Sequence, residues 1–288
     1  MTTLTVHHTL SSSDHERDAA TLLAEASQLS KSAIKDAMLK GAVWLTRGKQ
    51  HKRLRRATFT GQPGDTLSLY YDAALLRLAP PPAQLLADEK RYSVWIKAPG
   101  LLAQGTLQGD HCALLRLAEV QLKREVYLVH RLDREAAGLM LIAHDGKAAA
   151  AFSQLFASAK SDRLCKQYRV LVQGELHSAG DIALPLDGKA ALTRYHPLQQ
   201  DAALQATWLQ IELVTGRKHQ IRRHLAAIGH GVLGDPRYGS GNAHAAGLQL
   251  YATALRFTCP LTHQARHYQW EPVPGLNSTQ DQANTSCL

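Results

Sequence analysis

The sequence predicts an α+β protein in two parts, and three observations lead to this prediction. A chain of 288 residues is long enough for two domains that each bury a core. Hydrophobic residues make up 45% and charged residues 20%, which is typical of a globular rather than a disordered protein. Helical patterns dominate the start of the chain, whereas short apolar runs of strand length dominate after residue 88.

We expect five segments along the chain. They are a loose N-terminus at 1–13, a small basic domain at 14–75, a Pro-rich linker at 76–87, a larger domain at 88–273 and a polar tail at 274–288. The linker is predicted from Ala79-Pro80-Pro81-Pro82-Ala83, because consecutive prolines favour an extended, semi-rigid chain.

The small domain is predicted to contain two helices and a few strands. A helical pattern spans 14–29, and Ser30 is placed to cap a second helix over 31–40. Strand patterns follow at 43–45 and 66–71. Between these strands lies the most basic stretch of the chain, and its cations are Arg47, Lys49, Lys52, Arg53, Arg55 and Arg56.

The larger domain is predicted to consist of short strands with few helices between them. The strand patterns lie at 92–96, 126–129, 139–143, 163–173, 208–215 and 249–258. Helical patterns lie at 146–160, where Asp145 is the expected cap, and at 218–228. The segment 114–124 fits either a helix or an irregular stretch.

The charge balance indicates a polyanionic partner. Lysine and arginine number 33 against 24 aspartate and glutamate, a formal charge of +9, which favours nucleic acid first and an anionic membrane second. No apolar run has the length of a membrane span, and residues 1–14 lack the pattern of a secretory signal. Four cysteines without a Cys-x-x-Cys pair predict neither a disulfide framework nor a zinc site, and they indicate a reducing cytoplasm.

Three separated motifs carry the candidate chemistry. In the first, Asp133 lies between Arg131 and Arg134 on a loop that two apolar strands enclose, and such a loop holds a carboxylate still while keeping it accessible. The second is Lys166-Gln167-Tyr168, at the start of a strand. The third, at 215–226, opens a helix with several cations and suits a phosphate or a carboxylate. Taken alone, the first and third motifs also fit solvated salt-bridge clusters.

Together the motifs resemble those of the RluA-type pseudouridine synthases, which act on uridines in ribosomal and transfer RNA. The matching residues occur in the family's order, and they are His130-Arg131-Leu132-Asp133-Arg134, Gly138-Leu139, Lys166 with Tyr168, Thr215–Arg222 and Gly234–Gly239. Residues 14–73 resemble the RNA-binding domain named after a small-subunit ribosomal protein. A basic patch of that kind contacts phosphates and gives salt-dependent affinity.

The resemblance implies a fold and a reaction. The family's catalytic domain is a mixed, mostly antiparallel sheet with flanking helices and an active cleft across its middle. Its reaction breaks the bond between uracil N1 and ribose C1′, turns the detached base and rejoins it through C5, without a cofactor, a metal or an energy source. We expect a cytoplasmic, monomeric enzyme whose partner is large-subunit ribosomal RNA or transfer RNA.

The resemblance also implies three catalytic roles. Asp133 matches the essential aspartate, since a carboxylate stabilises or attacks a glycosidic carbon that loses its base. Attack on the sugar, attack on the base and proton removal from C2′ remain open. Arg222 matches its ion-pair partner, because a carboxylate in a dry pocket needs a cation to stay ionised. Tyr168 matches the aromatic residue that stacks on the uracil.

Contacts with RNA are assigned to a wider set of residues. These are His130, Arg131, Arg134, Lys166, Arg217, His219, Gln220 and the six cations of the basic stretch. The target uridine must leave the stack, and His130 or Arg131 is the candidate that fills the space it leaves.

Three positions depart from the family pattern. Ile96-Lys97-Ala98-Pro99-Gly100 stands where Asn-Lys-Pro-x-Gly is usual, Ala136-Ala137 replaces a hydroxyl residue and its small neighbour, and Lys218 stands where a hydroxyl residue is common. None of these changes touches the three catalytic positions. They leave the RNA target open.

Other function classes explain the sequence less well. A catalytically inactive RNA-binding protein of the same fold shares the charge, but it does not explain a carboxylate among cations in three ordered motifs. Phosphoryl transfer is rejected because the kinase catalytic-loop spacing, its Asn and a Gly-rich phosphate loop are missing. A hydrolase of free nucleosides needs a second catalytic carboxylate in a comparable motif, and none is evident.

Overall fold

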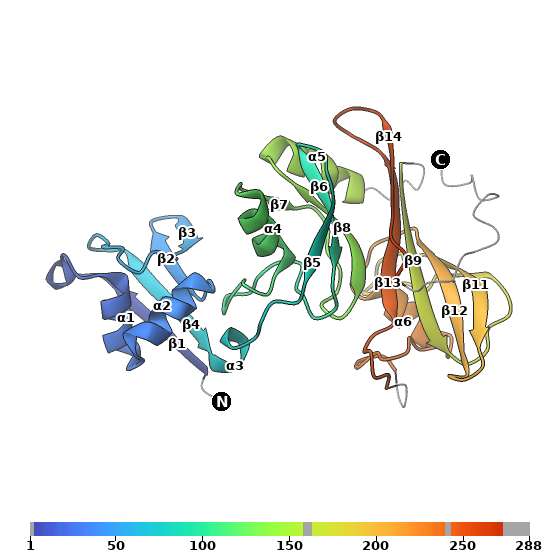
Figure 1. Cartoon of the computed structure of the whole chain (residues 1–288), viewed down its shortest axis with the longest axis horizontal. Helices are drawn as coiled ribbons and strands as arrows, with labels where there is room; N and C mark the ends of the chain where they lie inside the picture. The colour runs from blue at the N-terminus through green and yellow to red at the C-terminus, as the bar shows by residue number, and fades with distance from the viewer. Residues whose placement is uncertain (1–2, 158–162, 240–242, 273–288) are drawn as a thin grey trace. The chain divides into compact units, whose positions relative to one another are not determined.

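The computed structural model describes residues 3–157, 163–239 and 243–272, and the expected polar tail at 274–288 lies outside this range. The chain forms two compact units (Figure 1). Unit 1 contains Met1–Pro81 and Gln104–Lys123, and unit 2 contains Pro82–Ala103 and Arg124–Leu288.

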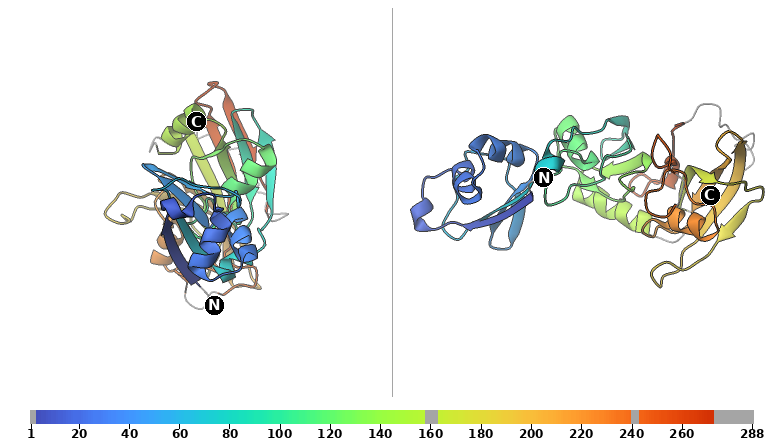
Figure 2. Two further views of the ribbon diagram at one scale, coloured as in Figure 1. Left: turned by 90° about the vertical axis from the view of Figure 1, so that its left-hand side faces the viewer. Right: turned by 90° about the horizontal axis from the view of Figure 1, so that it is seen from below.

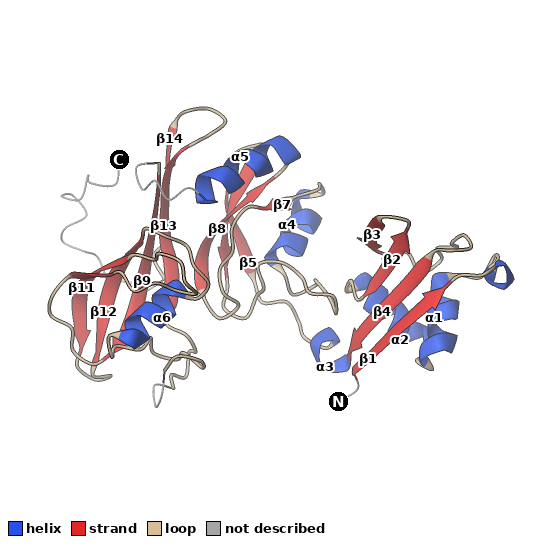
Figure 3. Ribbon diagram, turned by 180° about the vertical axis from the view of Figure 1, so that it is seen from behind, coloured by secondary structure: helices blue, strands red, loops and turns tan. Residues whose placement is uncertain are grey.

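Unit 1 contains a four-stranded antiparallel sheet with α1 and α2 on one face, as Figures 2 and 3 show. Its elements are β1 (Thr3–Thr9), a 3-10 turn (Ser12–Asp14), α1 (Ala19–Ser27), α2 (Lys31–Leu39), β2 (Val43–Arg47), β3 (Gln50–Arg53), β4 (Thr66–Asp72), α3 (Ala73–Leu76) and α4 (Leu114–Leu122). The strand order is β1-β4-β2-β3. Alternate residues of β2 and β4 pack against α1 and α2 in one core, and the Ser30 side chain caps α2 as expected by accepting the Ala33 N–H.

The N-terminus differs from the expected loose segment. Residues 3–9 form β1, which pairs with β4 from Thr3 opposite Asp72 to Thr9 opposite Thr66. Apolar residues are few in β1, and only alternate side chains are half-buried. Such a segment has no continuous apolar run from which a strand could be predicted. Its position is set by backbone hydrogen bonds with β4.

The segment Gln104–Lys123 packs with unit 1, although the sequence analysis placed it inside the larger domain. Asp110 accounts for much of this packing, because its carboxylate pairs with Arg53 and Arg55 and its N–H donates to the Lys40 carbonyl. The indole N–H of Trp44 donates to the Leu107 carbonyl at 3.0 Å. These are long-range partners that no local pattern specifies.

Unit 2 is built on a large mixed sheet. Its elements are β5 (Ala83–Asp88), β6 (Tyr92–Lys97), β7 (Tyr127–Leu128), β8 (Ala137–Ala143), α5 (Gly146–Ala157), β9 (Leu164–Gln173), β10 (Gly180–Ile182), β11 (Thr193–Asp201), β12 (Ala206–Leu213), α6 (Gln220–Ala227), β13 (Leu250–Thr258) and β14 (Ala265–Gln269). The strand order is β10-β11-β12-β9-β13-β8-β6-β5, with β14 beside β13 and β7 beside β8. Among the described strands, every pairing is antiparallel except that of β8 with β13. The mixed, mostly antiparallel fold is therefore confirmed.

Two helices cover different parts of this sheet (Figure 3). Helix α6 packs against β9 and β12, and its Ile221 and Leu225 share a core with Val170. Helix α5 packs against β8, where Phe152 contacts the apolar face that includes Leu141. Strand β13 contributes to both cores, because a register shift at 252–254 changes which of its residues face each helix.

Gly138 allows β8 and β13 to approach closely. It lies opposite Ala252 in the parallel pairing, with φ +122°, and a Cβ there would lie 2.2 Å from the Ala252 carbonyl oxygen. Only glycine fits such a position. Since Gly138 follows the Asp133 loop by a few residues, this close contact fixes where that loop begins its return to the sheet.

The remaining differences from the sequence analysis lie at the edges. The expected linker at 76–87 ends in β5, an edge strand, and β14 was not expected. The segment 114–124, which fitted two readings, contains α4. Among the described residues, no helix is long and apolar enough to cross a membrane.

Candidate active site

A small pocket of about 80 Å³ opens on unit 2 between the Asp133 loop and the start of α6. Its lining brings together all three sequence motifs. The lining residues are Arg131, Leu132, Asp133, Ala136, Tyr168, Leu213, Arg217, His219, Gln220, Ile221, Arg222 and Leu250. The three catalytic residues expected from the sequence therefore lie around one pocket.

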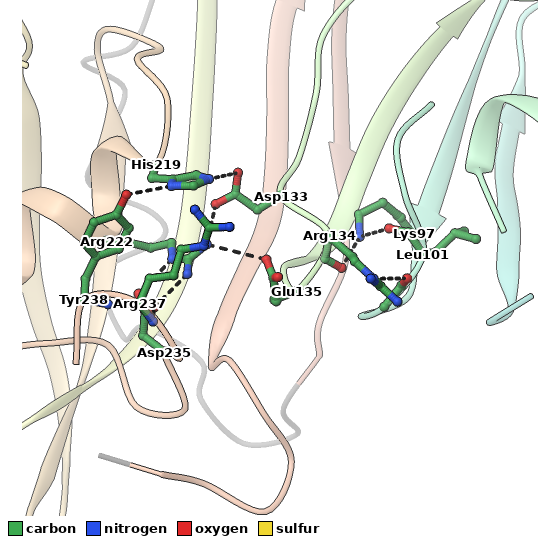
Figure 4. Close-up of polar contacts among 11 residues, drawn as sticks. Lys97, Leu101, Asp133, Arg134, Glu135, His219, Arg222, Asp235, Arg237 and Tyr238 are labelled. Carbon is green, nitrogen blue, oxygen red and sulfur yellow. Dashed lines mark hydrogen bonds and ion pairs between the residues drawn. The ribbon is translucent and has the colours of Figure 1, made fainter. Parts of the chain in front are cut away.

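Asp133 and Arg222 form an ion pair at this pocket. The loop between β7 and β8 presents the Asp133 carboxylate, of which 25% remains exposed, and its Oδ2 accepts a hydrogen bond from Arg222 Nη1 at 3.0 Å (Figure 4). Glu135 lies on the same loop, 3.6 Å from the same Nη1. Strands β7 and β8 anchor the two ends of the loop, so the carboxylate is held close to the start of β8.

Asp235 in turn fixes the position of Arg222. Arg222 Nε and Nη2 donate to the two Asp235 oxygens at 2.7 Å each, and both side chains are almost fully buried. The N–H groups of Arg237 and Tyr238 donate to Asp235 Oδ1 at 2.8 and 3.1 Å. Every polar atom of the pair thus has a partner, which a buried ion pair requires.

The pKa values of Arg222 and Asp235 shift in opposite directions from their ordinary values. Burial lowers the pKa of Arg222, but the hydrogen bonds that it donates to Asp235 and Asp133 outweigh this effect and raise its pKa above the ordinary value. Burial raises the pKa of Asp235, but the hydrogen bonds from Arg222 and from two backbone N–H groups lower it overall. Both groups therefore stay charged at neutral pH.

Tyr168 forms one wall of the pocket. It lies on β9, on the same face as Val170 and Val172, and is 9% exposed. Burial raises the pKa of its hydroxyl, and the nearby Asp133 charge adds to this effect. The phenol is therefore neutral at neutral pH, and it contributes to the lining of the pocket.

His219 lies between Asp133 and Tyr238 (Figure 4). Its Nδ1 is 2.8 Å from the Tyr238 hydroxyl, and its Nε2 is 3.6 Å from Asp133 Oδ1. Burial lowers its pKa. The residue has a left-handed backbone, with φ +53°, which costs a non-glycine residue on the order of 1–3 kcal/mol and often marks a functional position.

Lys97 fixes the Asp133 loop from the opposite side (Figure 4). The residue is fully buried at the end of β6, and its ammonium donates to the carbonyls of Leu101, Ala98 and Arg134 at 2.8, 3.1 and 3.2 Å. Burial lowers the pKa of Lys97 to about 8, although Asp133 and Glu135 counteract this. Lys97 thus ties the turn at 98–101 to the residue that follows the catalytic candidate.

Two residues expected to contact RNA have structural partners instead. His130 Nε2 accepts the Leu141 N–H at 2.9 Å, its ring stacks on Phe156 at 4.0 Å, and burial lowers its pKa to about 3. The Gln220 amide accepts from Arg217 N–H and the Thr215 hydroxyl, and it donates to residues 192 and 193. His130 Nε2 and the whole Gln220 amide are thus used within the protein, and contact of these two residues with RNA stays a prediction.

Four further cations were expected to contact RNA, and they differ in exposure and in whether they line the pocket. Arg131 and Arg217 line it and are exposed, and Arg217 Nε donates to the Ala190 carbonyl at 3.1 Å. Arg134 is exposed and donates to the Gly100 carbonyl at 3.2 Å. Lys166 is 9% exposed, and burial lowers its pKa. Arg131 and Arg217 are therefore the cations best placed to meet a substrate at the pocket.

The basic stretch of unit 1 is less free than its sequence suggests. Arg47 donates twice to Asp65 at 2.7 and 2.6 Å, and Arg53 and Arg55 both pair with Asp110. Arg56 Nε donates to the Thr58 hydroxyl at 3.3 Å. Lys49 and Lys52 are exposed and form no ion pair with another described residue. The two lysines are thus the cations of this stretch most available to a phosphate.

The sequence analysis did not assign roles to four residues that complete the site. These are Lys97, Glu135, Asp235 and Tyr238. Two motifs in the sequence contain three of these residues. Asp235 and Tyr238 belong to the Gly-Asp-x-x-Tyr-Gly motif, and Lys97 to the turn motif that follows β6. Each motif was treated as a mark of resemblance, whereas its polar side chains are partners of the catalytic candidates.

The site's chemistry follows from this arrangement. A carboxylate fixed beside a neutral aromatic ring and backed by a rigid cation suits the stabilisation or capture of an electron-poor carbon. Among residues 3–157, 163–239 and 243–272, no group of three or more His, Cys, Asp or Glu is placed to hold a metal ion.

Comparison with known proteins gives one consistent result. A family model described as RNA pseudouridylate synthase matches residues 91–227. The chain is 34% identical over 163 residues to ribosomal large subunit pseudouridine synthase D of Zymomonas mobilis subsp. mobilis, which covers 47% of this chain and 49% of that protein. It is 29% identical over 218 residues to the dual-specificity RNA pseudouridine synthase RluA of Vibrio vulnificus, covering 67% and 86%.

A solved structure shares the fold. Human RNA pseudouridylate synthase domain containing 4 aligns with a TM-score of 0.53 at 24% identity, covering 65% of this chain and 88% of that one. The similarity to the Zymomonas enzyme spans about half of that enzyme's length.

Proposed function

Because the chain belongs to the RluA-type pseudouridine synthases, we propose that it isomerises uridine to pseudouridine in ribosomal or transfer RNA. The observation that supports this most directly is the chain of contacts from Asp133 through Arg222 to Asp235, at a pocket that Tyr168 also lines. A cytoplasmic location is part of the proposal, since that is where such transcripts are modified.

The reaction requires one bond to break and another to form. The C1′–N1 bond of the target uridine breaks, the uracil turns, and a C1′–C5 bond forms, while a proton leaves C5 and a proton is gained at N1. Asp133 acts on the ribose or the base at the moment when C1′ is electron-poor. Arg222 keeps the carboxylate ionised and oriented, because its own position is fixed by Asp235.

The remaining groups recognise the flipped nucleotide. The Tyr168 ring offers a face for the uracil, as is usual when proteins read unstacked bases. Arg131, exposed on the pocket's rim, is the candidate to fill the space that the uracil leaves in the RNA, since His130 is committed to Leu141. Lys49 and Lys52 supply phosphate contacts from unit 1.

Tritium release tests the proposal. Ribosomal and transfer RNA transcripts that carry tritium at uridine C5 are incubated with wild type and with Asp133→Asn, which keeps the shape of the side chain without its charge. Release by wild type alone supports the isomerisation and identifies the RNA class. Binding of RNA without release from any transcript, with the two proteins indistinguishable, would leave an RNA-binding protein.

A further inference from the structure

His219 has its two ring nitrogens directed at two different partners, one of which is Asp133. Nδ1 lies 2.8 Å from the Tyr238 hydroxyl, and Nε2 lies 3.6 Å from Asp133 Oδ1 (Figure 4). The side chain is 13% exposed. The ring is thus directed at Asp133 and Tyr238, whereas the sequence analysis assigned His219 to contacts with RNA.

We propose that His219 is a positioning residue for Asp133 and that the Tyr238 hydroxyl selects its tautomer, so that Nε2–H points at the carboxylate. The proposal rests on the proposed function, because it concerns the same carboxylate. It adds two residues with defined roles to the pair formed by Asp133 and Arg222.

The tautomer follows from what each partner accepts. An ionised carboxylate only accepts hydrogen bonds, whereas a tyrosine hydroxyl either donates or accepts. The proton therefore belongs on Nε2, facing Asp133, and Nδ1 accepts from Tyr238. The distance of 3.6 Å is slightly longer than a hydrogen bond, which is common for catalytic hydrogen bonds in enzymes without substrate.

The charge state of His219 also suits this role. Burial lowers its pKa, and the nearby cations Arg222, Arg237 and Lys218 lower it further, whereas Asp133 raises it. The ring is therefore neutral at neutral pH. A neutral donor orients the carboxylate without the full charge neutralisation that a second cation would cause.

Two residues at the start of α6 act together on Asp133. His219 and Arg222 are three residues apart at the N-terminus of α6, so they face the same side. Arg222 takes Oδ2 and His219 faces Oδ1. Because each oxygen has its own neighbour, rotation of the carboxylate about its Cβ–Cγ bond is restricted in the free enzyme.

Two isosteric variants separate the roles of the ring nitrogens. His219→Gln places an amide N–H near the position of Nε2, and His219→Asn places its amide near the position of Nδ1. In single-turnover reactions with saturating enzyme, we expect His219→Asn to be slower than wild type by about 10–100-fold, and His219→Gln to retain about tenfold more activity than His219→Asn. The RNA dissociation constant should change less than twofold in both. His263→Asn, in the exposed turn between β13 and β14, is the control.

A spectroscopic readout tests the tautomer without any activity. In ¹⁵N NMR of the full chain, His219 should show a protonated Nε2 and an unprotonated Nδ1, and Tyr238→Phe should reduce this preference. Tyr238→Phe should also shift the acid limb of the pH–rate profile, because it changes the hydrogen bond that the neutral ring accepts.

The outcomes are distinguishable. Equal losses in His219→Gln and His219→Asn together with weaker RNA binding would make His219 an RNA contact and overturn the inference. A protonated Nδ1, or a tautomer indifferent to Tyr238→Phe, would also overturn it. If wild type released no tritium from any RNA, the proposed function would fail, while the NMR experiment would still decide the His219 tautomer.

Discussion

Replacing Lys97 by methionine should remove a pH-dependent part of the stability of unit 2. Lys97 is fully buried, and its pKa falls from 10.5 to about 8. Between these two values the unfolded chain binds a proton that the folded chain does not. The free energy of unfolding therefore rises with pH across this window. At 1.36 kcal/mol for each tenfold change in proton affinity, the gain is about 3 kcal/mol.

The variant is expected to lack this gain. Lys97→Met keeps an unbranched side chain of similar length but has no titrating group. At pH 7 two effects oppose each other, because the variant leaves the carbonyls of Ala98 and Leu101 without the ammonium and also removes a buried charge. The difference between wild type and variant should therefore change by about 3 kcal/mol from pH 7.5 to pH 10.5, whatever its value at pH 7.

Urea unfolding followed by tryptophan fluorescence measures this difference. Three of the four tryptophans, Trp95, Trp208 and Trp270, lie in unit 2, so the signal reports mainly on that unit. Lys147→Met, an exposed position on α5, is the control and should follow wild type at every pH. Parallel curves for wild type and Lys97→Met between pH 7.5 and pH 10.5 would refute the reasoning.

Three further predictions concern other contacts. Asp235→Asn leaves a buried arginine partly unpaired and should lower stability by about 3 kcal/mol or more, which calorimetry should record as a fall in Tm of about 6–12 °C. Gly138→Ala places a methyl group 2.2 Å from a β13 carbonyl and should destabilise unit 2 clearly more than Gly188→Ala, where φ is also positive (+71°) but the space around the added methyl group is open; equal urea midpoints would contradict this. Replacing both Lys49 and Lys52 by alanine should leave Tm unchanged and reduce the salt dependence of RNA binding by about 0.7–0.9 per lost phosphate contact, and an unchanged slope would exclude both lysines from the RNA interface.

Local patterns predicted the regular elements well where the pattern is periodic. The alternation in β9 placed Tyr168 and Val170 on one face, and the stripe of Ile221 and Leu225 placed α6 on the same core. Helix N-caps could also be predicted from the sequence, since Ser30 and Asp145 accept hydrogen bonds from backbone N–H groups in the first turns of their helices. Such features depend on neighbours within one or two turns, and that information lies in the local sequence.

Partners that are distant in sequence could not be predicted in the same way. Arg53 and Arg55 belong to the most basic stretch of the chain, yet Asp110, more than fifty residues away, takes both. Gln220 looked like a polar contact at a helix start, but the turn around it uses its whole amide. In both cases the charge or polarity was visible in sequence, whereas its partner was fixed only by the tertiary structure.

The pair of Arg222 and Asp235 shows that the contact made with the Asp133 carboxylate depends on a residue that does not itself contact it. Burying an ion pair is a weak way to stabilise a fold, because desolvation offsets most of the attraction. Its geometric effect is larger. A free arginine has many rotamers, but here Asp235 fixes Nε and Nη2, so Nη1 can point in one direction only. That direction leads to Asp133 at 3.0 Å. The residue that contacts the carboxylate is thus made rigid by one that lies behind it, and mutation of Asp235 should impair chemistry even where unit 2 remains folded.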